Sequence, residues 1–142
     1  FKLFTVPGQV AHDGTRKAVL SRADGVMFVA DSQNNQIYNN GASFDNLVTN
    51  AGMVGLDLSQ LPLVVQFNKR DMPDILSEEE ILSRWSQAPW PVHFASALEG
   101  SGVLESFGAL LGKVYDRLDP EFEFQTVHQL SRENLIAAVR GE

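Results

Sequence analysis

The sequence contains no cysteine, few basic residues and no long hydrophobic run. Without cysteine, disulfide bonds, thiolate catalysis and thiolate-bound zinc are excluded, which fits a reducing compartment. Eleven basic and eighteen acidic residues give a net charge of −7, which repels nucleic acid and anionic membranes. No run of about 18 apolar residues is present to span a bilayer. We therefore expect a cytoplasmic protein with neither a nucleic-acid partner nor an integral membrane segment.

Apolar runs typical of strands alternate with helical patterns along the chain. The predicted strands cover residues 1–5, 25–31, 61–67 and 91–96. The predicted helices cover residues 15–23, about 37–48, a segment that begins with a capping box at Ser77 and Glu80, and 101–118. This alternation predicts an α/β fold, with a mostly parallel sheet and helices on both faces. We expect one domain over residues 1–118, and a tail over residues 119–142 with a short helix.

The segment Asn68-Lys69-Arg70-Asp71 directly follows a predicted buried strand. Ligands bind at the carboxyl ends of parallel strands, so these side chains can reach one. The Asp71 carboxylate can accept two hydrogen bonds from the ring N–H and the amine of guanine, a pair that adenine lacks. Asn68 can bond the base or tie loops together, and the methylene stem of Lys69 can lie along the purine face. The alternative interpretation is a solvated turn.

A second segment, Val6-Pro7-Gly8-Gln9, follows the first predicted strand. Gly8 can bring its backbone N–H close to a γ-phosphate, because no side chain intervenes. Gln9 has the donors and the acceptor needed to hold an attacking water in line with that phosphate. A type II turn with Pro7 followed by Gly8 explains the same residues without catalysis.

A third segment, Ser96-Ala97, follows the last predicted strand. The backbone N–H groups of these two residues can bond the carbonyl oxygen of guanine from the side opposite Asp71. A helix-entry loop with Ser101 as the cap is the alternative. Asp31, at the end of another strand, is expected to cap the next helix rather than to act as a catalytic acid.

The order of these parts resembles a Ras-like GTPase from its third strand onward, over residues 1 to about 118. Within that superfamily, "FTVPGQ", "TRKAVL", "DGVMFVADSQ" and "NKRDMPD" resemble the MglA family, bacterial Ras-like GTPases of cell polarity and gliding motility. The resemblance implies a P-loop NTPase G domain that binds GTP or GDP, needs Mg²⁺ and meets a roadblock-fold activating partner, MglB. Gln9 is then catalytic, in the role that glutamine has in Ras and Gα proteins. The other implied contacts are Gly8 with the γ-phosphate and Asn68, Lys69, Asp71, Ser96 and Ala97 with guanine.

Three features depart from the family pattern. Thr5 stands where Ras relatives usually have an aspartate that holds the Mg²⁺ shell, so we assign no metal ligand in this chain. Leu98 replaces the lysine of the S-A-K motif. No G-x-x-x-x-G-K-[ST] phosphate loop occurs, so we expect an N-terminally incomplete G domain whose phosphate-binding part is supplied upstream. If nothing precedes, the strands at 1–5 and 25–31 must pair directly, because unpaired buried backbone groups cost about 1–3 kcal/mol each.

Two functions remain open at this point. One is a GTP-hydrolysing switch that regulates cell polarity or gliding motility through a partner protein. The other is a nucleotide-free interaction module, a pseudo-GTPase or fragment that keeps the G-domain scaffold and binds a partner through its helices without catalysis. Loss of GDP affinity on replacing Asp71 distinguishes them.

Overall fold

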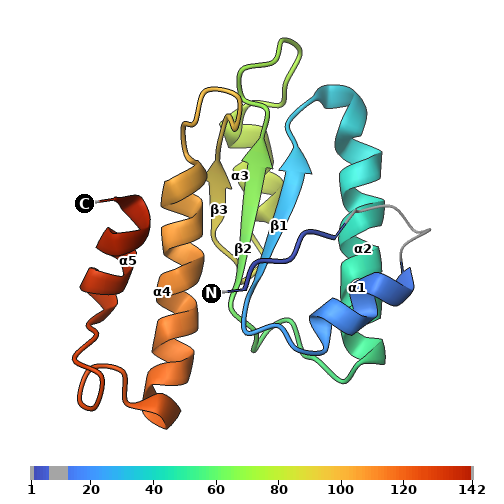
Figure 1. Cartoon of the computed structure of the whole chain (residues 1–142). Helices are drawn as coiled ribbons and strands as arrows, with labels where there is room; N and C mark the ends of the chain where they lie inside the picture. Colours follow the sequence, from blue (N-terminus) through green and yellow to red (C-terminus); the bar gives the residue numbers. More distant parts are fainter. Residues whose placement is uncertain (1, 7–12, 142) are drawn as a thin grey trace.

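The computed structural model describes residues 2–6 and 13–141 (Figure 1). Three parallel strands form a sheet in the order β1-β2-β3, with Asp31 paired to Asn68 and Phe67 paired to Phe94. The elements in chain order are α1 (Asp13–Leu20), β1 (Val26–Asp31), the 3₁₀ turn η2 (Asn34–Gln36), α2 (Ile37–Met53), β2 (Leu63–Asn68), α3 (Glu78–Trp85), β3 (Val92–Phe94), α4 (Val103–Phe122) and α5 (Arg132–Arg140). The predicted α/β architecture with a parallel sheet is confirmed.

Helices pack on both faces of the sheet because side chains alternate along β2. Leu63, Val65 and Phe67 point into the main core with α2 and α3. Gln66 points to the opposite face, where its amide donates to the hydroxyl of Ser106 on α4. Figure 1 shows α4 and α5 on one side of the strands and α1 and α2 on the other.

Aromatic rings fill the core between the sheet and α2 and α3. Phe44 of α2 packs edge-on against Phe28, Trp85 and Trp90, with ring centroids 5.0, 4.9 and 5.3 Å away. Edge-to-face pairs of this kind add about 0.5–1.5 kcal/mol each beyond the area they bury. The cluster fixes α2 and α3 against the strands and so fixes the loops that follow those strands.

The helix boundaries follow local sequence signals in part. The capping box is present, since Ser77 accepts from the Glu80 N–H and the Glu80 carboxylate accepts from the Ser77 N–H. The helix predicted to stop at residue 118 continues to Phe122, with Pro120 in its last turns. Proline costs one helical hydrogen bond there, which is tolerated near a helix end that closes at Glu123 in the left-handed conformation.

The prediction of a strand at residues 1–5 is wrong for residues 2–5, the part of it that the structure describes. Residues 2–6 form no strand and pair with no element, and Leu3 and Phe4 are 76% and 66% exposed. An alternating pattern reports which side chains are apolar, but a strand also needs a hydrogen-bonded neighbour. Direct pairing of residues 2–5 with β1 does not occur, and β1 is an edge strand among the described residues.

The terminal helix predicted in the tail is confirmed as α5, which packs along α4. The hydroxyl of Tyr115 donates to the carbonyl of Leu130 at 2.9 Å, and Arg132 pairs with Asp116 at 3.0 Å. The predicted division at residue 118 falls within α4 and stays a prediction. Among the described helices, none has both the length and the apolar composition that crossing a membrane requires.

Candidate functional site

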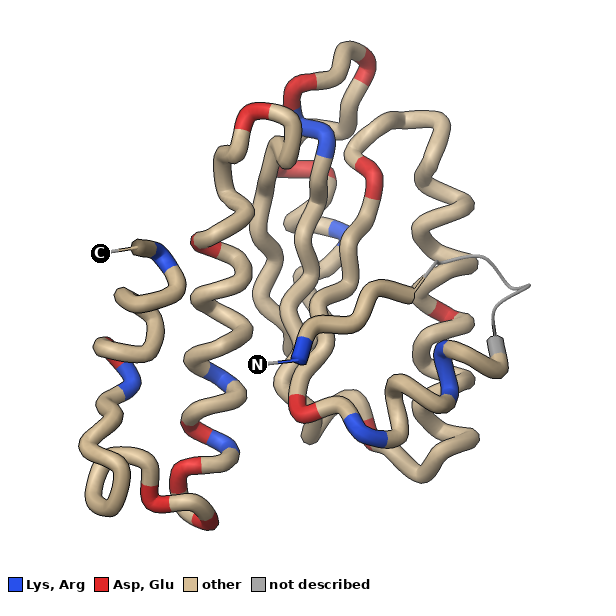
Figure 2. Tube along the Cα trace, viewed as in Figure 1, with Lys and Arg blue, Asp and Glu red and all other residues tan. Residues whose placement is uncertain are grey.

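Three loops meet at the carboxyl edge of the sheet. They follow β1 at Ser32, β2 at Lys69 and β3 at Ala95. Backbone bonds join them, because the Ser32 N–H donates to the Asn68 carbonyl at 3.0 Å and the Arg70 N–H donates to the Ala95 carbonyl at 3.1 Å. Figure 2 shows acidic and basic residues side by side in these loops. The sheet edge therefore presents one connected, charged surface where ligands bind in folds of this class.

Asp71 is held by the loop after β3. Its Oδ1 accepts a hydrogen bond from the buried hydroxyl of Ser96 at 2.6 Å. The same hydroxyl accepts from the N–H of Glu99 at 3.3 Å, which orients it. The hydrogen bond from Ser96 fixes the Asp71 carboxylate. Asp71 itself is only half-buried, so the carboxylate stays accessible to a ligand. This pairing was not predicted, although both residues were predicted to lie in the base site.

Asn68 ties the loops together, which was one of its two predicted roles. Its Oδ1 accepts from the Ala97 N–H at 2.9 Å, and the Ser96 N–H donates to the Ser101 carbonyl at 2.9 Å. Both N–H groups predicted to bind the guanine carbonyl therefore already donate hydrogen bonds within the protein, to Asn68 and to Ser101. Their bond to a base stays a prediction, and it requires that each N–H be shared or released.

The alternative view of this loop, with Ser101 as a helix cap, is wrong. The N-cap of α4 is Gly102, which has φ +72° and forms no side-chain cap. A Cβ at Gly102 would overlap the carbonyl of Phe94, so only glycine fits between β3 and α4. Ser101 instead pairs with Ser96 through two backbone hydrogen bonds that close the loop.

Lys69 and Asp31 form an ion pair across the sheet edge. The Lys69 ammonium lies 2.7 Å from Oδ2 of Asp31, and the two side chains are 51% and 20% exposed. The prediction that Asp31 caps the next helix is wrong, because the N-cap of α2 is Gln36. Its Oδ1 accepts from the Gln33 N–H at 3.0 Å and so closes the turn before η2. The partnership follows from the register of β1 and β2, which the sequence does not reveal.

Arg70 anchors the loop instead of facing a ligand. Its guanidinium donates to the Leu76 carbonyl at 2.7 Å and lies 5.3 Å from the centre of the Phe94 ring. These contacts hold both ends of the segment that carries Asp71. Gly8 and Gln9 lie outside the described residues, so the structure does not place them.

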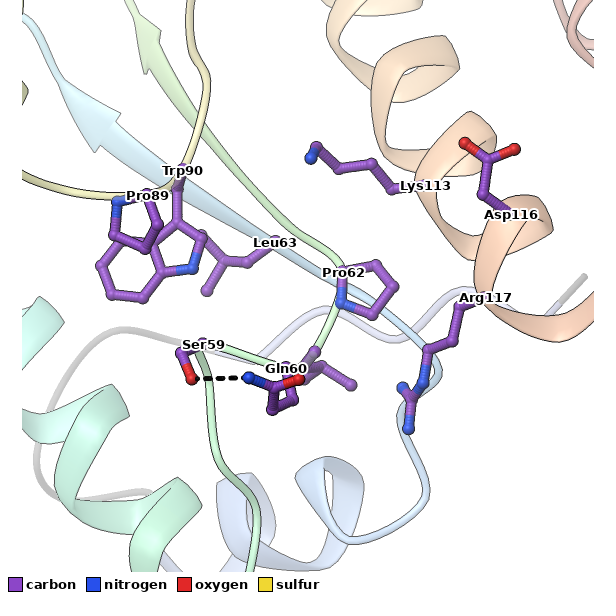
Figure 3. Close-up of a pocket in the computed structure, with 10 residues that line it drawn as sticks. Ser59, Gln60, Pro62, Leu63, Pro89, Trp90, Lys113, Asp116 and Arg117 are labelled. Carbon is purple, nitrogen blue, oxygen red and sulfur yellow. Dashed lines mark hydrogen bonds between the residues drawn. The ribbon is translucent and has the colours of Figure 1, made fainter.

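A hollow of about 310 Å³ lies at the opposite, amino end of the strands (Figure 3). Trp90 and Pro89 line one side of it, and Lys113 and Arg117 of α4 line the other. It is remote from the loops that carry Asp71, and ligands of doubly wound sheets bind at the carboxyl edge. We therefore place the candidate site at the carboxyl edge and not in this hollow.

The comparison with protein families agrees with this architecture. The ADP-ribosylation factor family matches residues 1–114, a span that includes all three strands and the first part of α4. The chain belongs to the ADP-ribosylation factor family. The match includes every residue predicted to contact the nucleotide, and the predicted Ras-like G-domain fold is confirmed.

A curated relative agrees with the narrower resemblance. The chain is 41% identical over 118 residues to the "mutual gliding-motility protein MglA" of Myxococcus xanthus (strain DK1622). The aligned region is 83% of this chain and 60% of MglA, so the chain spans about three fifths of the relative's length. The predicted resemblance to MglA is confirmed.

Proposed function

We propose that this chain is the guanine-recognising part of a cytoplasmic molecular switch that binds GTP and hydrolyses it to GDP. The observation that carries the proposal is the half-buried Asp71 carboxylate, fixed by Ser96 at the carboxyl edge of a parallel sheet. Family membership and the similarity to MglA support the same assignment.

The carboxylate of Asp71 fits guanine in its hydrogen-bonding capacity. An ionised carboxylate offers about four lone-pair sites on two oxygens, and the Ser96 hydroxyl uses one of them. Two further acceptors remain for the ring N–H and the exocyclic amine of guanine. Adenine has no such pair of donors, and leaving a polar site unsatisfied can reduce affinity by about 10⁴-fold.

Hydrolysis is proposed to depend on residues before α1. Gln9 orients the attacking water, Gly8 contacts the γ-phosphate, and the loop after Gly8 changes shape when that phosphate is lost. Mg²⁺ neutralises phosphate charge when it accompanies GTP. Within residues 2–6 and 13–141, no group of three or more histidine, aspartate or glutamate side chains converges on a metal site. The recognition of the base proposed here does not depend on the metal.

The output of the switch is proposed to be contact with another protein. The name of the M. xanthus relative refers to gliding motility, which supports a role in motility or cell polarity. By resemblance to the MglA family, the partner is an activating protein of the roadblock fold, similar to MglB. The nucleotide-dependent loop after Gly8 is the segment that such a partner would read.

Titration of the full-length protein, with any residues that precede Phe1, against a fluorescent GDP analogue tests the proposal. Replacing Asp71 by alanine removes two charge-assisted hydrogen bonds and is expected to weaken GDP binding roughly 100-fold or more. Asp45→Ala removes the same charge from the exposed face of α2 and serves as the control. Equal GDP affinity in wild type and Asp71→Ala would contradict base recognition by Asp71, and a wild-type protein that binds no GDP would leave the nucleotide-free interaction module as the better account.

A further inference from the structure

The backbone of Lys69 adopts a conformation that is unfavourable for its residue type. Lys69 has φ +66°, in the left-handed region that non-glycine residues rarely adopt. Strained residues of this kind persist where the surroundings fix them, and they concentrate at ligand sites. Here the flanking bonds fix it, since the Asn68 carbonyl accepts from Ser32 and the Lys69 carbonyl accepts from the Met72 N–H at 3.1 Å. The direction in which the Lys69 side chain leaves β2 is therefore set by the fold.

Asp31 is fixed just as firmly at the end of β1. The amide of Asn40 on α2 brackets its backbone, because Asn40 Oδ1 accepts from the Asp31 N–H at 3.0 Å and Asn40 Nδ2 donates to the Asp31 carbonyl at 2.8 Å. The Gln33 N–H holds Oδ1 of the side chain, which leaves Oδ2 for the Lys69 ammonium. The Asn40 amide thus fixes the backbone of Asp31, and the Gln33 N–H fixes its carboxylate so that Oδ2 faces the lysine.

Stabilisation of the fold is a weak explanation for this ion pair. The Lys69 side chain is 51% exposed, and ion pairs that are open to solvent contribute little to folding stability. What the pair does change is the freedom of the lysine, whose four-carbon stem otherwise samples many rotamers. Holding the ammonium before a ligand arrives removes that freedom in advance and strengthens binding.

We propose that Asp31 is a positioning residue of the purine site, which holds the Lys69 ammonium so that the lysine stem lies ready against the face of the base. The inference rests on the proposed function and refines it. Contact with the face of a purine is independent of the groups on its edge. Asp31, at the end of β1, therefore contributes to affinity for any purine nucleotide, whereas Asp71, on the loop of Lys69 after β2, selects guanine.

Asp31→Asn is the variant that isolates this role. Asparagine keeps an oxygen that can accept from the Gln33 N–H, so the local turn is retained while the charge that holds Lys69 is lost. Lys69→Met removes the ammonium and keeps most of the apolar stem. Asp45→Asn makes the same charge change on the exposed face of α2 and is the matched control.

The measurement is the affinity of the full-length protein for GDP and for inosine diphosphate, which lacks the exocyclic amine. We expect Asp31→Asn to weaken both nucleotides by the same factor, about three- to tenfold, and to leave their ratio unchanged. Asp31→Glu, which keeps the charge, is expected to recover part of the affinity. In the Lys69→Met background, Asp31→Asn is expected to have no further effect, because the two residues act as one unit.

Two results would overturn the inference while leaving guanine recognition intact. One is unchanged affinity for both nucleotides in Asp31→Asn. The other is the same loss in the Lys69→Met background, which would show that Asp31 acts independently of the Lys69 ammonium. Failure of the proposed function has a different signature, namely a wild-type protein that binds no guanine nucleotide, or an Asp71→Ala variant that keeps the preference for GDP over inosine diphosphate.

Discussion

The hydroxyl of Ser96 lies 2.6 Å from Oδ1 of Asp71 and so joins the loop after β3 to the loop after β2. Hydrogen bonds to charged groups are short and contribute about 1.5–3 kcal/mol. This bond orients the carboxylate on which base recognition depends. Its geometry makes Ser96 a support for Asp71 through its side chain, in addition to the backbone role predicted from the sequence.

Replacing Ser96 by alanine is expected to weaken GDP binding about tenfold, because Asp71 loses the group that orients it. Ser101→Ala is the control, since Ser101 contacts Ser96 through backbone atoms only in the bonds described. Both variants are measured by GDP titration and by thermal unfolding. Equal affinity in Ser96→Ala and wild type would contradict a role for this hydroxyl in the site.

Two fully buried serines are expected to respond in opposite ways to the same substitution. The Ser32 hydroxyl has no hydrogen-bond partner among the described residues, whereas the Ser106 hydroxyl accepts from Gln66 and donates to the Gly102 carbonyl at 2.8 Å. Ser32→Ala removes an unsatisfied buried group and is expected to raise the free energy of unfolding by about 1 kcal/mol. Ser106→Ala leaves the buried Gln66 amide without this acceptor and is expected to lower the free energy of unfolding by about 1–3 kcal/mol. Urea denaturation of the two variants, side by side, checks both signs.

The capping box of α3 is expected to make stability depend on pH. Bonds from the Ser77 backbone N–H and then the Ser77 hydroxyl lower the pKa of Glu80 below its ordinary value of 4.5. Because the folded pKa is the lower one, the contribution of Glu80 is present above pH 4.5 and is lost as the pH falls through the folded pKa.

Ser77→Ala removes the hydroxyl of the cap and is expected to lower stability at pH 7 by about 1 kcal/mol. The difference from wild type should shrink as the pH falls below 4.5 and through the lowered pKa of Glu80, because protonation then neutralises the carboxylate in both proteins. Ser83→Ala, on the exposed surface of α3, is the control. A difference that stays constant over this range would contradict the described cap.

Features set by neighbours along the chain could be predicted from the sequence. The capping box depends on Ser77 and Glu80, three positions apart, and α4 depends on a periodicity that its own residues carry. The positions of Asn68 and Asp71 at a strand end follow from a buried run that stops abruptly. Each of these signals needs only local information.

Features set by the register between strands could not be predicted. Asp31 meets Lys69 because β1 and β2 align Asp31 with Asn68, and no local pattern encodes that alignment. The use of the Ala97 N–H by Asn68 likewise depends on how two loops pack. The first predicted strand failed for a related reason, since residues 2–5 have a strand-like pattern but no neighbour to pair with among the described residues.

The most direct measurement of the central claim is a change of base preference in Asp71→Asn. Asparagine presents one acceptor and one N–H donor, which match the ring N–H and the 2-carbonyl of xanthine and no longer match the 2-amine of guanine. We predict that Asp71→Asn in the full-length protein weakens GDP binding and gains binding of xanthosine diphosphate, so that the preference reverses by about 100-fold or more. An Asp71→Asn protein that still prefers GDP as strongly as wild type does would contradict the assignment of Asp71 as the guanine-reading residue.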